Sequence, residues 1–180
     1  LQLAAAAAGG NVTKNPLGRE LGVARAITST EAGRGHKLLA GRGAAWDAPC
    51  IHLDIVAGPP GETTVLARNA FAEVQAAEIR HDGGVFWGVQ YHPEYSLREL
   101  SVIMRRRIPL LMQEGFFATQ LDGLRHCDAY EALHADPTRR DVAWALGLQP
   151  EILDPAQRLT EIRNFIEHYV RPTKSARGRA

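Results

Sequence analysis

The sequence predicts an α/β fold that continues into a C-terminal helical extension. Short apolar runs separated by Gly, Pro and Asp occupy most of the first 115 positions, and such runs are typical of strands. Residues 85–91 are almost continuously apolar, which favours a strand buried on both faces of a parallel sheet. From about residue 116 onward helical patterns replace these runs.

The composition is that of a globular protein and excludes several classes of partner. The chain has 180 residues, 45% of them hydrophobic and 23% charged, which is enough for one domain with a buried core. Because 21 basic and 20 acidic residues leave a net charge of +1, we expect neither nucleic acid nor a membrane surface as partner. No apolar run approaches the ~20 residues that span a bilayer.

The two cysteines, Cys50 and Cys127, are too few for a disulfide framework and lack the Cys-x-x-Cys spacing of zinc or redox sites. This usage favours a reducing, cytoplasmic setting. No group of histidines and carboxylates has metal-ligand spacing, so we expect no metal and no other cofactor. The chain starts without Met and without a helix-capping residue, and we therefore expect it to be a fragment of a longer protein.

The elements are predicted in order along the chain. Residues 1–8 should form a helix that Gly9 and Gly10 end. Residues 30–43 should form a loop with a short helical turn at residues 37–39. Strands are predicted at residues 21–28, 51–56, 64–67, 74–80 and 85–91.

The second half should contain helices alone. Ser96 starts one, because Glu99 follows three residues later in a capping-box pattern, and Pro109 interrupts or ends it. Asp136 and Asp154 are each followed by proline, the pattern of an N-cap before a first helical residue. A final helix should bury one apolar face, formed by Leu159, Ile162, Phe165, Ile166 and Tyr169.

The candidate chemistry lies in residues 88–94, Gly-Val-Gln-Tyr-His-Pro-Glu. Here a strand ends in an imidazole, His92, and a carboxylate, Glu94; open parallel sheets bind ligands at such strand ends. Pro93 biases His92 toward an extended conformation, in which side chains two residues apart point the same way. Glu94 could then fix the His92 tautomer, as in a nucleophilic triad. A His-x-Glu spacing alone is more often a surface pair.

The whole heptapeptide resembles the Gly-[Val/Ile]-Gln-[Phe/Tyr]-His-Pro-Glu signature of the class I glutamine amidotransferases. Residues 36–41, 76–79 and His52-Leu53-Asp54 are similar to other segments of that family, and Leu1-Gln2 resembles the end of its nucleophile motif, Gly-x-Cys-x-Gly-x-Gln. The resemblance implies a flavodoxin-like fold, of which this chain holds a part.

The resemblance also divides the chain. It assigns residues 1–115 to the C-terminal portion of a class I glutamine amidotransferase domain. Residues 116–180 match nothing in the family pattern, so we assign 116–170 to a helical extension and 171–180 to a disordered basic tail.

The activity implied by the resemblance is hydrolysis of the glutamine side-chain amide by a Cys-His-Glu triad. A cysteine thiolate attacks the amide, His92 protonates the departing ammonia and then activates water, and Glu94 keeps His92 aligned. The register of the nucleophile motif places this cysteine three residues before Leu1, so the 180-residue chain is expected to be inactive.

The resemblance implies substrate-binding residues as well. Gln2 would help to hold the substrate glutamine. Residues around Ile51 and His52 would contact its α-amino and α-carboxyl groups.

Three functions remain open at this point. The first is a glutaminase subunit similar to that of GMP synthase, which supplies ammonia to a synthase partner or acts as a homo-oligomer. The second is a γ-glutamyl hydrolase of the same superfamily, and the third is a non-catalytic binding or regulatory remnant. A docking surface in the helical extension should expose an apolar patch, whereas a lid should fold back toward His92.

Cys50 is a weaker candidate for the nucleophile. It lies two residues before His52, but it lacks the small neighbours and the strand-to-helix turn of a nucleophile elbow. We expect a buried structural cysteine instead.

Overall fold

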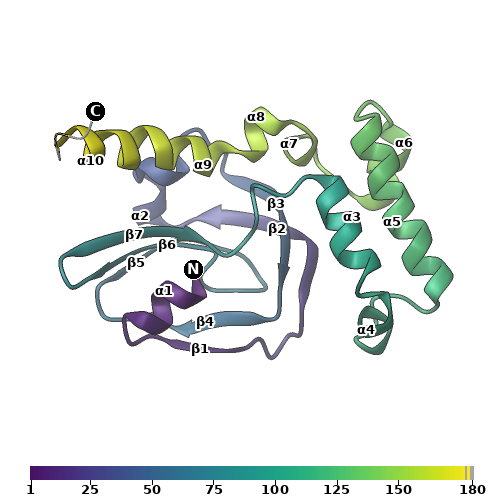
Figure 1. Cartoon of the computed structure of the whole chain (residues 1–180), viewed down its shortest axis with the longest axis horizontal. Coiled ribbons are helices and arrows are strands. Elements are labelled where there is room, and N and C mark those ends of the chain that lie inside the picture. Colours follow the sequence, from purple (N-terminus) through teal and green to yellow (C-terminus); the bar gives the residue numbers. More distant parts are fainter. Residues whose placement is uncertain (177, 179–180) are drawn as a thin grey trace.

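The computed structural model describes residues 1–176 and residue 178. Strands dominate the first half and helices the second, as Figure 1 shows. In chain order the elements are α1 (Gln2–Ala7), β1 (Asn11–Lys14), β2 (Glu20–Ser29), α2 (Glu31–Arg34), the 3-10 helix η1 (Lys37–Leu39), β3 (Ala45–His52), β4 (Asp54–Gly58), β5 (Thr63–Arg68), β6 (Ala76–His81), β7 (Gly84–Val89), α3 (Leu97–Arg105), α4 (Ile108–Gln113), α5 (Gln120–Ala135), α6 (Arg140–Leu146), α7 (Pro150–Leu153), α8 (Pro155–Arg158), α9 (Thr160–Phe165), the π-helix η2 (Ile166–Val170) and α10 (Arg171–Ala176).

The strands form two sheets, and the pairings among the described strands are all antiparallel. Five of them lie in the order β3-β2-β5-β6-β7, while β1 pairs with β4 in a separate ribbon. The fold is therefore mixed α/β with C-terminal helices, and the parallel sheet expected from the sequence is not part of the described structure.

The expectation that residues 85–91 form a strand buried on both faces is wrong. This segment contributes β7, an edge strand on which Phe86 is 40% exposed. The reason is the turn that precedes it: Asp82 and Gly83 both have positive φ, and His81 pairs with Gly84. Such a two-residue turn joins neighbouring antiparallel strands, so β7 must pair with β6.

The strand expected at residues 51–56 is two strands in different sheets. β3 ends at His52 and pairs with β2, whereas β4 begins at Asp54 and pairs with β1. β3 also begins earlier than expected, at Ala45, and it runs through Pro49. Proline lacks an N–H, and an edge strand such as β3 can accommodate it.

The helices form two groups. α3–α7 pack together on β2 around a core that includes Val23, Leu100 and Leu133. The chain then returns over the five-stranded sheet as α8, α9, η2 and α10, shown in yellow in Figure 1. Phe165 of α9 packs there against Trp87 of β7, with ring centroids 6.4 Å apart.

Two of the three predicted helix starts are confirmed. Ser96 and Glu99 form a reciprocal capping box at the start of α3, and the Asp154 carboxylate caps α8 by accepting from the N–H of Ala156. Asp136 was assigned wrongly: it ends α5, and its carboxylate bonds Thr138 in the turn before α6.

The tail expected to be disordered is helical over residues 171–176. Residues 171–176 form α10, which continues η2, and Arg171 bonds Glu167 one turn earlier at 2.7 Å. Residues 177, 179 and 180 of the predicted tail lie outside the described residues. None of the helices in the described part of the chain is long and apolar enough to cross a bilayer.

Candidate functional site

His92 and Glu94 form a hydrogen-bonded imidazole–carboxylate pair. Nδ1 of His92 lies 2.7 Å from Oε1 of Glu94. Because an ionised carboxylate only accepts, Nδ1 carries the proton. Nε2 makes no hydrogen bond to any described residue, and in the neutral ring it is the basic nitrogen. The side chains are 31% and 50% exposed, so the pair is open to solvent.

The backbone of the pair is a turn, which corrects the extended conformation expected from the sequence. The N–H of Tyr95 donates to the carbonyl of His92 at 3.1 Å and closes a four-residue turn around Pro93 and Glu94. Proline suits the second position of such a turn because its φ is already fixed. The turn brings Glu94 to His92 by a different geometry from the one predicted.

Two further contacts fix the position of His92. Its N–H donates to the carbonyl of Pro49 on β3 at 2.7 Å, which ties the turn to the sheet edge. The ring of Tyr95 stacks on the imidazole with centroids 4.3 Å apart and planes at 11°. Tyr95 is not among the site residues predicted from the sequence; its aromatic ring three positions after His92 was the only indication of this contact.

Glu94 is ionised at neutral pH. Its partial burial opposes ionisation, but hydrogen bonds from His92 and from the backbone N–H of Glu94 outweigh that effect and hold its pKa below the ordinary value. A carboxylate in this state can stabilise an imidazolium at His92 while the ring carries a proton.

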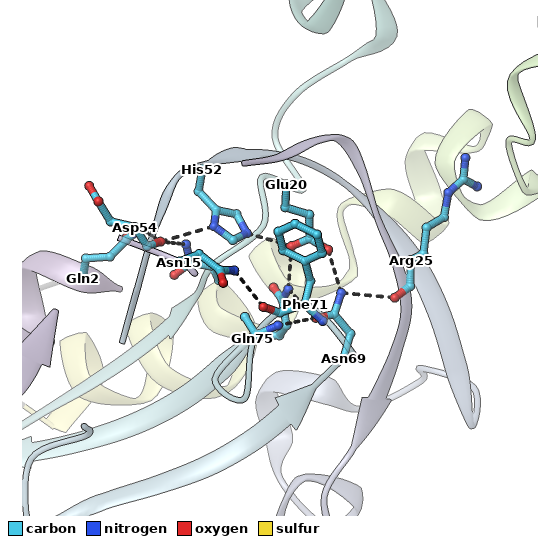
Figure 2. A network of polar contacts seen from close by, with 11 residues as sticks. Gln2, Asn15, Glu20, Arg25, His52, Asp54, Asn69, Phe71 and Gln75 are labelled. Carbon is cyan, nitrogen blue, oxygen red and sulfur yellow. Dashed lines mark hydrogen bonds and ion pairs between the residues drawn. The ribbon is translucent and has the colours of Figure 1, made fainter. Parts of the chain in front are cut away.

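Gln2 belongs to a second polar group, at the junction of β3 and β4. The carbonyl of Asp54 accepts hydrogen bonds from the Gln2 side chain at 3.3 Å and from the Gln90 side chain at 3.0 Å. Nδ1 of His52 faces the same oxygen at 3.2 Å, as Figure 2 shows. Gln90 lies two residues before His92, so this junction is linked to the chain that carries the pair.

His52 is buried in a network around Glu20 (Figure 2). Nε2 of His52 lies 2.7 Å from the Glu20 carboxylate, which also accepts from Asn69 at 2.7 Å and from Gln75 at 2.8 Å. Both nitrogens of His52 are therefore occupied by protein acceptors. Ile51 is half-buried on β3 and pairs with Leu21. The substrate contacts expected of Gln2, Ile51 and His52 stay predictions.

Neither cysteine is available as a nucleophile in this structure. Cys50 and Cys127 are both 0% exposed. Burial raises the pKa of the Cys50 thiol well above its ordinary value and also raises the pKa of Cys127. Within the residues that the structure describes, no cluster of three or more His, Cys, Asp or Glu side chains could hold a metal ion.

The C-terminal helices reach the pair. A cavity of about 180 Å³ separates the turn from α9, with Pro93 and Glu94 on one side and Glu161, Ile162 and Phe165 on the other. This is the position in which a lid over the site was expected to lie.

The family of the chain follows from its first 108 residues, which match the family model described as Glutamine amidotransferase class-I. The chain belongs to this family. The matched segment contains the heptapeptide with His92 and Glu94 and ends within the helical region, at the start of α4.

A curated relative extends the similarity through the remaining helices. The Gamma-glutamyl-L-1-hydroxyisopropylamide hydrolase of Pseudomonas sp is 32% identical over 179 residues, which are 96% of this chain and 59% of the relative. The chain thus spans little more than half the length of the relative it matches.

Two solved structures share the fold. A glutamine amidotransferase from Thermotoga maritima has a TM-score of 0.52 at 17% identity, over 78% of this chain and 58% of its own. A glutamine amidotransferase from Methylobacillus flagellatus has a TM-score of 0.51 at 22% identity, over 82% and 60% of the two chains.

Proposed function

We propose that the protein hydrolyses γ-glutamyl amides, with His92 as the acid–base group and Glu94 as the carboxylate that orients it. The observation that carries the proposal is the 2.7 Å bond between the two side chains, which leaves Nε2 of His92 as the basic nitrogen. Hydrolysis is favoured over ammonia transfer because the similarity to the Pseudomonas hydrolase continues past residue 108 through the helical extension.

The proposed reaction passes through a thioester. The nucleophile is a cysteine that we expect ahead of Leu1. Nε2 of His92 takes the proton of its thiol, and the resulting thiolate attacks the γ-carbonyl carbon of the substrate. Nε2 then gives this proton to the departing amine, and a γ-glutamyl thioester remains. The neutral ring next removes a proton from water, which attacks the thioester and releases glutamate while the thiolate is restored. Glu94 stabilises the imidazolium, which exists before the amine departs and again after water has lost its proton.

Ammonia transfer to a synthase partner is the second candidate, and one observation favours it. Trp144 is 72% exposed beside a hollow of about 780 Å³ that Leu148 and Leu153 also line. An exposed apolar surface of this kind is what a docking partner requires. The hollow lies among α6 and α7, in the group of helices around α5.

The deciding experiment uses the protein expressed from the whole gene, including any codons that precede the Leu1 codon. It is assayed with a γ-glutamyl alkylamide and with glutamine, and released amine, ammonia and glutamate are measured. We expect a higher kcat/KM for the alkylamide. His92→Ala should lower kcat on the order of 10²- to 10⁴-fold because the proton transfers lose their catalyst, and Glu94→Gln should lower it less.

The matched control is His81→Ala. His81 also lies beside a carboxylate, Asp82 at 3.4 Å, but on the exposed β6–β7 turn. This variant should keep full activity. Unchanged hydrolysis in His92→Ala would refute the proposal, and a clear preference for glutamine with ammonia passed to an acceptor would favour the second candidate.

The 180-residue chain alone provides a separate test of the nucleophile. We expect it to release no amine and no ammonia, because both of its cysteines are buried. Activity in this chain that His92→Ala abolishes would instead point to Cys50.

A further inference from the structure

Glu161 of α9 forms a buried polar cluster with Arg42 and Tyr91. Nε and Nη2 of Arg42 donate to its two carboxylate oxygens at 2.7 and 2.6 Å. The hydroxyl of Tyr91 donates to Oε1 of the same carboxylate at 2.9 Å. The side chains of Arg42 and Glu161 are 4% and 2% exposed, and Tyr91 is 2% exposed.

The cluster lies next to the catalytic pair in the chain. Tyr91 immediately precedes His92, whose N–H is held by the Pro49 carbonyl. Trp46 of β3 packs edge-on against the ring of Tyr91 at 6.5 Å and also lies beneath the guanidinium of Arg42 at 5.5 Å. The peptide that joins Tyr91 to His92 is therefore fixed through the tyrosine side chain on one side and through Pro49 on the other.

A buried ion pair is poorly explained by stability alone. Apolar residues of similar volume are often at least as stabilising, because taking both charges out of water costs free energy. A charged pair does impose one arrangement: the fork of Arg42 fixes the carboxylate of Glu161, and one oxygen of that carboxylate then fixes the Tyr91 hydroxyl.

We propose that Glu161 and Tyr91 are positioning residues for His92. Through the Glu161–Tyr91 hydrogen bond, the C-terminal helix sets the orientation of the peptide that carries the imidazole. The inference rests on the proposed function for its effect on catalysis, because His92 is the reacting base there. Its effect on the His92 ring is independent of any substrate.

Other contacts hold the same helical segment to η1 and to β7 without touching Tyr91. The side chain of Asn164 donates to the carbonyls of Leu38 and Ala40 at 2.9 and 2.8 Å. The hydroxyl of Tyr169 donates to the carbonyl of Val85 at 2.5 Å. Tyr169→Phe is therefore a matched control for Tyr91→Phe. Each substitution removes one hydroxyl that joins this segment to the strand-rich part, but only the Tyr91 hydroxyl belongs to the residue next to His92.

The kinetic test compares these variants in the full protein. Tyr91→Phe and Glu161→Gln should lower kcat for a γ-glutamyl alkylamide about tenfold, because small misplacements of a catalytic group are costly. KM should change by less than about twofold, and Tyr169→Phe should leave both values unchanged. The double variant Tyr91→Phe/Glu161→Gln should be no slower than the slower single variant, since both changes break the same link.

The spectroscopic test needs no substrate. In 15N-labelled protein, the imidazole resonances of His92, assigned by their loss in His92→Ala, should shift in Tyr91→Phe and stay in place in Tyr169→Phe. If Tyr91→Phe leaves these resonances unchanged, or if the two variants shift them equally, the positioning role is wrong. If the wild-type protein hydrolyses no γ-glutamyl amide, the proposed function fails, and the resonances still decide the role of Tyr91.

Discussion

The carboxylate of Glu94 is held in its ionised form mainly by the imidazole it orients, and this has a consequence for stability. Its pKa lies below the ordinary value of 4.5, so the native state favours the ionised form more than the unfolded chain does. The stabilisation is therefore fully present at pH values above about the ordinary pKa. It is lost as the pH falls through the lower pKa of the native state. Because the side chain is half exposed, the contribution should not exceed about 1 kcal/mol.

Glu94→Gln should show this dependence directly. We expect the variant to be less stable than the wild type at pH 7, and the difference to shrink as the pH falls below 4.5. Urea denaturation at a series of pH values measures it. A difference that stays constant down to pH values at which the native carboxyl is protonated would show that ionisation of Glu94 contributes nothing.

The two cysteines should behave as packing residues. Both are fully buried, and burial keeps the Cys50 thiol protonated at neutral pH by raising its pKa. Iodoacetamide should therefore modify neither thiol in the native protein and both thiols in urea. Mass spectrometry of the labelled peptides gives the result. If iodoacetamide rapidly labelled Cys50 in the native protein and activity was lost, Cys50 would again be a candidate nucleophile.

At the scale of elements, the Glu20 network joins the start of β2, the end of β3 and the segment that precedes β6. Glu20 is 5% exposed and accepts from His52, Asn69 and Gln75. Its removal leaves donors of His52, Asn69 and Gln75 without this acceptor, and the side chains of His52 and Gln75 are buried.

Glu20→Ala should therefore destabilise the protein by roughly 3–5 kcal/mol, because each buried donor that loses its acceptor costs about 1–3 kcal/mol. Glu62→Ala, at an exposed glutamate in the turn before β5, is the control and should stay within about 0.5 kcal/mol. Urea unfolding curves compare the two variants. Equal stability of the variants would mean that the network contributes nothing to the fold.

Local patterns predicted several elements because their causes are local. The capping box at Ser96 and the cap at Asp154 each depend on residues within one helical turn, and both are confirmed. The division between β3 and β4 could not be predicted, because the change at Leu53 depends on which distant strand each half pairs with. The apolar run at residues 85–91 is compatible with a buried parallel strand, but the turn at Asp82 and Gly83 pairs it with β6 as an edge strand.

In the candidate site, too, local patterns predict neighbours in the sequence but not contacts between distant residues. His92 and Glu94 were predicted because a seven-residue string contains both, and the structure brings them together. The contact between Tyr91 and Glu161 joins residues 70 positions apart, and no pattern within the sequence specifies it. That contact depends on the return of α9 to the sheet, which no local pattern predicts.

At the scale of the whole molecule, the region after residue 115 does not act as one appendage. α5–α7 pack with α3 and α4 at one end of the sheet, whereas α8–α10 lie over the sheet itself (Figure 1). The second segment covers Trp87 with Phe165 and supplies the carboxylate that pairs with Arg42. By this packing it belongs to the core of the strand-rich part.

Removal of residues 155–180 tests this assignment. The truncation would expose Trp87 and remove the partners of the Arg42 guanidinium, the Glu161 carboxylate and the Arg158 carbonyl. We expect loss of cooperative unfolding in urea and binding of the dye ANS to the exposed apolar surface. Removal of residues 171–180 alone should leave stability within about 0.5 kcal/mol, because α10 is mostly exposed. If both truncated proteins unfolded like the full chain, α8–α10 would be a dispensable cover, and the link from Glu161 to His92 would lose its structural basis.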